Sequence, residues 1–349
     1  MDYRVYCGVD FHARQQTICS LTTEDGVITT RELKHQNKAE LKAFYAQFRG
    51  PVLVGLEASG YSPWFEHLLE ELGHEVWLGD ATEIRRRARR RQKNDRRDAE
   101  LILDLLTHDE FPRVHRPNMQ SREVLRMLRY RQKLVQMRTT IKNSLQALSL
   151  QSGLSLRAKL FTRAGLEQLS TALMSPAMQY QRDQWLQALE PLQARINEAT
   201  TWLQQQAAGD ERIERLRTHP GIGPLTGLAL VHTLEPVARF SNQRKVAAYV
   251  GFDPKERSSA EKKRYLSISK AGSRVLRFLL VEAAQSACKS DPELRRFYLR
   301  LSHRHGKAKA KVAVARKLLI RGYIHLRDQI DYAEFTRRAV AARLAREIT

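Results

Sequence analysis

The sequence predicts an α/β domain at the N-terminal end of the chain, followed by a mainly helical remainder. Two apolar segments, at 5–9 and 52–56, have the length of buried strands, and each ends in a carboxylate, Asp10 and Glu57. Farther along the chain, apolar residues recur at helical spacing over two long stretches, 118–151 and 177–206. These observations favour a strand-containing domain joined to long helices.

Turn and capping residues divide the N-terminal part into alternating strands and helices. Strands are predicted from apolar or alternating segments at 4–9, 16–23, 27–33, 51–56 and 74–78. Helices are predicted at 38–48, at 62–72, and over the segment that carries Asp95 and Asp98. Ser62 and Pro63 form an N-cap and first-turn pair for the second helix, and Gly73 ends it. The order βββαβαβα, with acids on the first strand, the fourth strand and the last helix, is that of an RNase H-like nuclease fold.

The two long stretches of the remainder are predicted to be helices, the second with heptad-like apolar spacing. Glycines and a Ser-Pro pair separate them, so we expect the two helices to fold back on each other as a coiled-coil arm for spacing or dimerisation. Shorter helices are predicted at 243–250, 272–289, 292–302 and 307–329. The predicted domains are therefore 1–112 (α/β), 113–210 (arm), 211–332 (C-terminal, mainly helical) and 333–349 (basic tail).

A turn at 218–224 contains Gly221 and Gly223 and lies between two predicted helices. In a helix-hairpin-helix, such glycines let backbone N–H groups approach a phosphate at a helix N-terminus. A simple helix–helix connection would use the same glycines, and the sequence does not separate the two interpretations.

Charge indicates the kind of partner. The chain has 60 Lys and Arg against 38 Asp and Glu, a formal net charge of +22, which favours a polyanionic partner. No apolar stretch is long enough to span a bilayer, so no membrane role is expected. The three cysteines are isolated and lack metal-ligand spacing, which indicates reduced thiols in a cytoplasmic, nucleoid-associated protein without a zinc site.

Four carboxylates are the candidate catalytic groups: Asp10, Glu57, Asp95 and Asp98. Asp95 and Asp98 are three residues apart, so they share one face of a helix. Carboxylates at strand ends lose hydration when the chain folds, and this is unfavourable unless a cation or another partner compensates for the lost free energy. Two acids from strands and two from one helix could hold two Mg²⁺ ions for phosphodiester chemistry.

Basic residues next to these acids are the candidate nucleic-acid contacts, because Arg side chains bind phosphate well. In the first domain they are Arg85, Arg86, Arg87, Arg89, Arg90, Arg91, Lys93, Arg96 and Arg97. In the C-terminal region they are Lys262, Lys263, Arg264, Lys270 and Arg274. Ser258 and Ser259 stand beside the second group in what the sequence predicts to be a polar loop, where nearby cations could assist attack on a phosphate.

Five motifs in this order carry a resemblance to a known family. They are Gly8-Val9-Asp10, Glu57-Ala58-Ser59-Gly60, Lys93-Asn94-Asp95-Arg96-Arg97-Asp98-Ala99, Pro220-Gly221-Ile222-Gly223-Pro224 and Ser269-Lys270-Ala271-Gly272. Together they resemble the transposases of insertion-sequence family 110, the bridge-RNA recombinases, to which Piv-type DNA invertases are related.

The resemblance implies a RuvC-like domain whose metal-binding acids are Asp10, Glu57, Asp95 and Asp98, a coiled coil, and a C-terminal transposase domain with a catalytic serine. The serine follows a Gly-hydrophobic-x-Pro element, here at 251–254, which selects Ser259, with Ser258 as the alternative. It also implies a homodimer or homotetramer that acts on double-stranded DNA with a structured guide RNA.

Two other functions are open on the sequence. A RuvC-like endonuclease or junction resolvase would use metal-activated water and no serine. A basic nucleic-acid-binding protein without catalysis is the third interpretation, although four acids inside a basic domain would repel phosphate unless a metal neutralised them.

Overall fold

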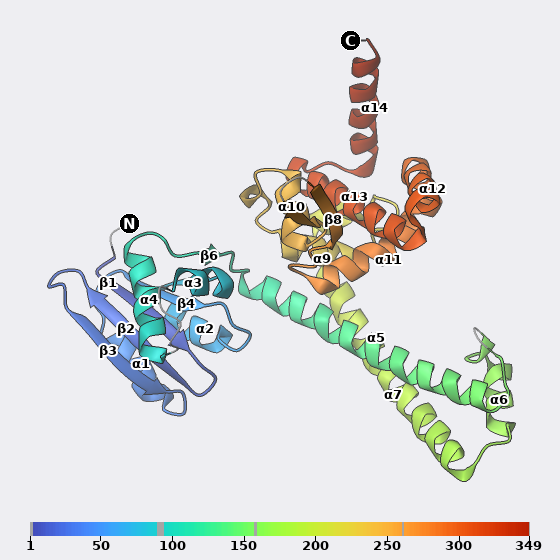
Figure 1. Cartoon of the computed structure of the whole chain (residues 1–349), viewed down its shortest axis with the longest axis horizontal. Helices are drawn as coiled ribbons and strands as arrows, with labels where there is room; N and C mark the ends of the chain where they lie inside the picture. Colours follow the sequence, from blue (N-terminus) through green and yellow to red (C-terminus); the bar gives the residue numbers. More distant parts are fainter. Residues whose placement is uncertain (1–2, 89–93, 157–158, 260–261, 349) are drawn as a thin grey trace. The chain divides into compact units, whose positions relative to one another are not determined.

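The computed structural model describes residues 3–88, 94–156, 159–259 and 262–348. The chain forms two compact units, Met1–Arg116 and Pro117–Thr349 (Figure 1). None of the described helices is long and apolar enough to cross a membrane.

The first unit is a mixed sheet with helices on both faces. Its strands are β1 (Val5–Phe11), β2 (Gln15–Thr22), β3 (Ile28–Lys34), β4 (Val52–Glu57), β5 (Glu75–Gly79) and β6 (Arg113–Val114), in the order β3-β2-β1-β4-β5-β6. The central pairs β1–β4 and β4–β5 are parallel, and the outer pairs are antiparallel. The helices are α1 (Lys38–Ala46), α2 (Pro63–Glu71), α3 (Ala81–Arg87) and α4 (Asp95–Thr107).

The predicted order of strands and helices is confirmed in this unit, and the mixed sheet is consistent with an RNase H-like fold. The helix α3 and the strand β6 are absent from the prediction. The helix α3 consists largely of polar and basic residues and buries only Ile84, so it lacks the apolar periodicity on which the prediction relied. The strand β6 has two residues, too few for any alternation to be recognised.

Alternation along β1 and β4 decides which side chains face which helices. Val5, Cys7 and Val9 of β1 pack in a core with residues of α1 and α2, as do Val54 and Leu56 of β4. Positions 8 and 55 therefore face the opposite side of the sheet, where α4 lies. Asp10 and Glu57 follow these positions by two residues and face the same side.

Gly8 is the position that allows α4 to lie close to the sheet. A Cβ atom at residue 8 would be 2.3 Å from the carbonyl oxygen of Ala99 and 2.4 Å from the amide nitrogen of Leu103, both in the backbone of α4. Any side chain would therefore push the helix away. The close packing brings the first turn of α4, with Asp95 and Asp98, towards the end of β1.

The second unit contains a long antiparallel pair of helices, α5 (Met119–Gln151) and α7 (Pro176–Ala207), joined through the short α6 (Arg163–Thr171). Arg131 on α5 donates a 2.7 Å hydrogen bond to Thr200 on α7, and Arg138 donates one of 2.6 Å to Gln193. Later positions on α5 thus pair with earlier ones on α7, so the helices fold back as predicted. Whether their packing is that of a coiled coil stays a prediction.

The remainder of the second unit is a bundle around one apolar core, to which α5 and α7 also contribute. Its helices are α8 (Glu211–Arg217), α9 (Pro224–Leu234), the short 3-10 helix η2 (Val237–Arg239), α10 (Gln243–Val250), α11 (Arg274–Ser290), α12 (Pro292–His305) and α13 (Lys307–Asp328). The last helix, α14 (Tyr332–Ile348), projects from this bundle (Figure 1), and none of its described residues belongs to the core. The segment predicted as a basic tail, 333–349, forms most of α14 up to the last described residue.

The predicted polar loop around Ser258 and Ser259 is wrong. The backbone there forms a two-stranded antiparallel hairpin, β7 (Pro254–Ser259) and β8 (Lys262–Ile268). Both strands are dominated by charged and polar residues, so they lack the apolar alternation by which strands are recognised in a sequence.

Candidate active site

The fold gathers the four predicted acids at one end of the central strands. Val9 of β1 pairs with Leu56 of β4 in parallel register, so Asp10 and Glu57 follow at the same edge of the sheet. Asp95 and Asp98 lie in the first turn of α4, whose N-cap Asn94 accepts a 3.1 Å hydrogen bond from the amide of Arg96. Asp10, Glu57 and Asp98 line a cavity of about 500 Å³, which we call the acid cavity.

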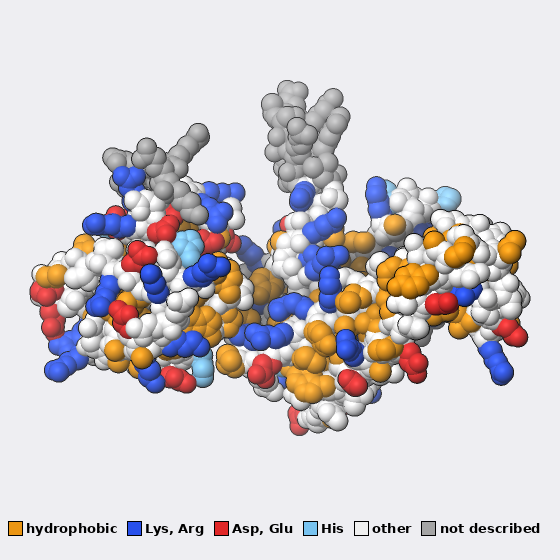
Figure 2. Space-filling view, turned by 90° about the horizontal axis from the view of Figure 1, so that it is seen from below, with side chains coloured by type: hydrophobic (Ala, Val, Ile, Leu, Met, Phe, Trp, Pro, Cys, Tyr) orange, Lys and Arg blue, Asp and Glu red, His pale blue; other side chains and the backbone are white. Residues whose placement is uncertain are grey.

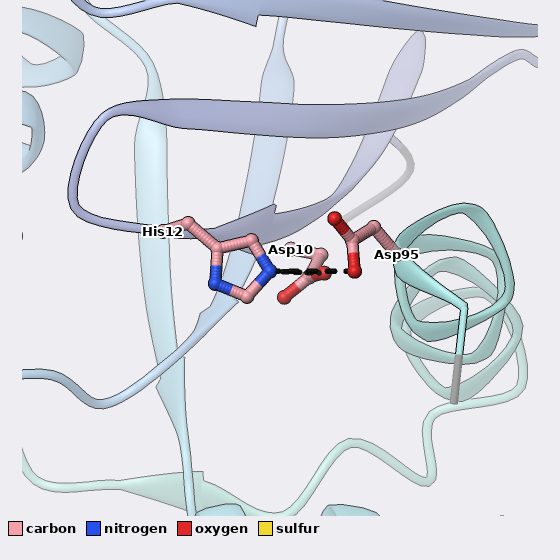
Figure 3. Close-up of side chains that lie close together, drawn as sticks. All are labelled: Asp10, His12 and Asp95. Carbon is pink, nitrogen blue, oxygen red and sulfur yellow. Dashed lines mark ion pairs between the residues drawn. The ribbon is translucent and has the colours of Figure 1, made fainter.

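Asp95 joins this site through a residue that the sequence analysis missed, His12. Its Nε2 atom lies 3.1 Å from Oδ2 of Asp10 and 3.5 Å from Oδ1 of Asp95 (Figure 3). Asp10 and His12 are two residues apart at the end of a strand and therefore point to the same side. That spacing was visible in the sequence and could have identified His12.

The surroundings of Asp10 disfavour its charged form. Burial raises the pKa of its carboxyl group; His12 counteracts this, whereas the carboxylates of Asp95 and Asp98 raise the pKa further. Its Oδ2 atom is buried and, among the described residues, accepts no hydrogen bond of good geometry. Glu57 differs, because Nη2 of Arg85 lies 3.3 Å from its Oε1. A half-buried carboxylate with one unsatisfied oxygen atom, beside two other carboxylates, is stabilised by a bound cation.

The geometry fits a divalent cation. The ligand atoms of Asp10, His12 and Asp95 all lie within 4.8 Å of one another. Around an octahedral Mg²⁺ with ligands at about 2.1 Å, neighbouring ligand atoms are about 3.0 Å apart and opposite ones about 4.2 Å. The 3.1 Å from His12 to Asp10 corresponds to neighbouring positions, and the 3.5 Å from His12 to Asp95 lies between the two values. Imidazole is a less usual Mg²⁺ ligand than carboxylate, so the acids are the better candidates to hold this ion, with His12 orienting Asp10 and Asp95.

The predicted basic clamp is only partly described. Arg85 contacts Glu57, whereas Arg86 pairs with Glu83 at 2.5 Å and Arg96 with Glu100 at 2.9 Å. Arg87 hydrogen-bonds the carbonyl of Glu110. The side chain of Arg97 is exposed. The other predicted members, Arg89, Arg90, Arg91 and Lys93, lie outside the described residues. On the visible face of both units, Lys and Arg side chains are scattered rather than gathered in one patch (Figure 2).

The serine hairpin lies in the second unit. Its backbone register places Ser258 opposite Lys263 and Ser259 opposite Lys262, so each serine has a lysine as its cross-strand neighbour. Arg264, also predicted to contact nucleic acid, pairs with Arg257 in the same ladder. The structure therefore brings the two candidate nucleophiles and the three predicted cations of β8 into one short element.

Two glycines anchor the base of this hairpin. Gly251 ends α10 with φ of 82°, and a Cβ there would lie 2.2 Å from the carbonyl oxygen of Ala271. Gly272, with φ of 65°, would similarly place a Cβ 2.0 Å from the carbonyl oxygen of Tyr249. The segments on either side of the hairpin thus cross in backbone contact. Lys270, in the same crossing, has φ of 60° and is exposed, as is Arg274 at the start of α11.

The two glycines of the α8–α9 turn have different surroundings. Gly221, with φ of 89°, packs against the backbone of α11, where a Cβ would lie 2.7 Å from the carbonyl oxygen of Ala283. Gly223 is the N-cap of α9 and has no atom within 4 Å of its would-be Cβ. Close packing against α11 accounts for a glycine at position 221. The space around Gly223 leaves the N-terminal end of α9 accessible.

The chain combines a sheet that carries clustered acids with a helical unit that carries a basic hairpin. Comparison with known proteins shows which class of enzyme has this combination. The family model DEDD_Tnp_IS110, described as "Transposase", matches residues 7–152. A second model, described as "Transposase IS116/IS110/IS902 family", matches residues 213–299. The chain belongs to the IS110 family of transposases.

Similar individual proteins are transposases as well. The chain is 29% identical over 288 residues to a probable family 20 transposase of Pseudomonas aeruginosa, covering 80% of this chain and 82% of the relative. It is 25% identical over 318 residues to the transposase for insertion sequence element IS1111A of Coxiella burnetii, covering 89% and 86%. With the transposase for insertion sequence element IS1328 of Yersinia enterocolitica it shares 28% over 242 residues, 67% and 70% of the two chains.

Family membership makes the protein a DNA transposase, and it implies DNA binding. The DEDD domain implies the use of a divalent metal, in agreement with the acidic group beside His12.

Proposed function

We propose that this transposase cuts and rejoins DNA through a covalent serine–DNA intermediate, with two Mg²⁺ ions held by Asp10, Glu57, Asp95 and Asp98. The observation that carries the proposal is the convergence of the acids: residues far apart in the sequence meet at one sheet edge. The buried Oδ2 atom of Asp10 has His12 3.1 Å away but, among the described residues, accepts no hydrogen bond of good geometry. Bound Mg²⁺ would supply Lewis acidity towards a phosphate oxygen.

The residues of the acid cavity have separate tasks in this scheme. Asp10 and Glu57 are fixed by adjacent parallel strands, so they provide rigid ligands. Asp95 and Asp98 are positioned by α4, whose distance from the sheet depends on Gly8. Arg85 neutralises Glu57 before metal and DNA arrive, and it can then turn to a phosphate, since its side chain is 77% exposed.

Ser259 is the proposed nucleophile, with Ser258 as the alternative. Its hydroxyl group releases its proton to solvent as the oxygen forms a bond to the scissile phosphorus. The bond from phosphorus to the leaving deoxyribose oxygen breaks, and that oxygen takes one proton from solvent and departs as a hydroxyl group, so no proton is gained or lost overall. The phosphodiester is replaced by a phosphoserine ester, so rejoining needs no external energy source. Lys262 and Lys263, opposite the serines in the hairpin register, support the negative charge that develops on the phosphate.

We further propose that a structured guide RNA selects the DNA, and that the protein acts as a homodimer or homotetramer. A net charge of +22 supplies non-specific affinity for nucleic acid. The sequence offers no recognisable helix-turn-helix for reading bases, so target choice by base pairing to an RNA accounts for specificity better. In the proposed division of labour, residues 1–112 hold the metals, 113–210 form the arm for assembly, and 211–332 carry the serine.

Covalent-adduct formation tests this function. Full-length protein is incubated with its RNA, Mg²⁺ and end-labelled DNA, and protein–DNA adducts are detected after denaturation. Ser259→Ala is expected to remove the adduct and Ser258→Ala to retain it wholly or in part. Loss in Ser258→Ala alone would make Ser258 the nucleophile. Cleavage by both variants would instead establish the resolvase mechanism, in which metal-activated water attacks.

A further inference from the structure

The second unit contains a separate cavity that the proposed chemistry does not use. It has a volume of about 940 Å³ and is lined by residues of α5, the C-terminal end of α9, α10 and the start of α11. We call it the α5–α11 cavity. This volume falls within the range of about 300–1,000 Å³ that is usual for small-molecule sites, so it suits single nucleotides rather than a duplex.

The charged side chains that line this cavity are all positive. Arg129 and Lys133 lie one turn apart on α5, and Arg274 is the first residue of α11. Among the described residues that line the cavity there is no carboxylate. Ser273 caps α11 by accepting a 3.2 Å hydrogen bond from the amide of Leu276, and residues 272–275 at the start of this helix line the cavity, so the positive end of the helix dipole lies beside it. These groups together suit a phosphate.

Aromatic rings stand beside the cations. Tyr249 and Phe278 line the cavity and are 37% and 39% exposed, high for large apolar side chains. The guanidinium group of Arg239 lies 4.2 Å from the centroid of the Tyr249 ring, and Phe240 contacts this ring edge-on at 5.3 Å. Tyr249 is thus held in place while part of its surface stays open. Such rings are the usual platforms for unpaired bases.

A buried polar group also points to a ligand. Thr233, at the end of α9, is 7% exposed and lines the cavity, and its hydroxyl has no hydrogen-bond partner among the described residues. Leaving a buried hydroxyl unpaired is unfavourable, and a hydrogen bond to a base or a sugar would satisfy it.

We propose that the α5–α11 cavity binds an unpaired nucleotide. The phosphate lies against Arg129, Lys133 and the start of α11, and the base stacks on Phe278 and Tyr249. The inference rests on the proposed function only for the source of this nucleotide, which is either a DNA strand opened during recombination or an unpaired part of the RNA. The chemistry of the cavity is common to both.

Binding of short single strands tests the proposal without any cleavage. Fluorescence anisotropy is measured in EDTA with fluorescein-labelled oligothymidine, oligouridine and an abasic strand of equal length. Wild-type protein is expected to bind a strand with bases more tightly than the abasic strand. Phe278→Ala should weaken that binding about 10-fold and remove the preference, because base stacking on an aromatic ring is lost. Lys133→Gln should weaken all three strands and lower the salt dependence.

Matched variants outside the cavity serve as controls. Tyr130→Ala removes an exposed aromatic ring on the same helix, and Lys309→Gln removes an exposed cation on α13; neither residue lines the cavity. If Phe278→Ala and Lys133→Gln bind like these controls, the proposal is overturned. A preference for oligothymidine supports the proposal and indicates a DNA strand as the ligand, whereas a preference for oligouridine supports it and indicates the RNA. Adduct formation by wild-type protein is scored separately, so failure of the cavity and failure of the serine mechanism are distinguishable.

Discussion

Gly8→Ala is the most direct test of how the fold builds the acid cavity. The new Cβ would lie 2.3 Å from the carbonyl oxygen of Ala99 and 2.4 Å from the amide nitrogen of Leu103, against an ordinary contact distance of at least 3.4 Å. Both neighbours are backbone atoms of α4, so no side-chain rotation relieves the clash. The helix must therefore move about 1 Å away from β1.

Such a shift has two measurable effects. Overpacking of this kind costs about 1–3 kcal/mol in the free energy of unfolding. Asp95 and Asp98 move with α4, and a displacement of about 1 Å at a catalytic centre lowers the rate by about 100-fold. Thermal or urea unfolding measures the first effect, and single-turnover cleavage of labelled DNA measures the second.

Gly60→Ala is the matched control for this substitution. Gly60 lies in the same unit, shortly after Glu57, yet a Cβ there would have no atom within 4 Å, and its φ is not in the left-handed region. We expect its stability to match that of the wild type, because the added methyl group meets no atom. Unchanged cleavage and unfolding in Gly8→Ala as well would refute the claim that close packing of α4 forms the site.

Three further predictions concern the metal, the pH dependence and the RNA. Asp10→Asn and Asp98→Asn should abolish strand cleavage while DNA binding in a mobility-shift assay persists; normal recombination by either variant contradicts the metal assignment. Burial lowers the pKa of His219 from 6.5 to about 4, so the unfolded chain takes up the proton first as the pH falls. The free energy of unfolding should therefore decrease by about 3 kcal/mol between about pH 6.5 and pH 4. When it is measured by urea unfolding at several pH values, it should change less with pH in His219→Gln than in the wild type. An identical pH dependence excludes His219 as the cause. Finally, the protein should co-purify with a structured RNA, and sequence-specific recombination by RNase-treated protein would disprove RNA guidance.

Most elements of the α/β unit, except α3 and β6, could be predicted from the sequence because their signals are local. Apolar segments ending in Asp10 and Glu57 gave the central strands, and the Ser62-Pro63 pair marked the start of α2 closely. The spacing of Asp10 and His12 at the end of a strand was visible in the sequence and could have identified the first contact of His12. Its second contact, 3.5 Å from Asp95, could not be predicted, because it depends on how α4 packs against the sheet.

Elements made mainly of polar residues could not be predicted from the sequence. The hairpin that carries Ser258 and Ser259 has charged residues along both strands, so no apolar alternation marked it. What fixes the base of the hairpin is long-range: the backbone crossing at Gly251 and Gly272 joins segments separated by the whole hairpin. The α5–α11 cavity is likewise formed by four separate helices; of its lining residues the sequence singled out only Gly272 and Arg274.

Chemical identification of the DNA-linked residue tests the central claim most directly. The adduct formed by wild-type protein would be isolated, digested with nuclease and trypsin, and the modified peptide sequenced by mass spectrometry. Trypsin cleaves after Arg257 and Lys262, so the phosphorylated nucleotide should be found on the peptide 258–262, at Ser259. DNA that is cleaved without any attached peptide, or a nucleotide on a peptide from elsewhere in the chain, would contradict the account.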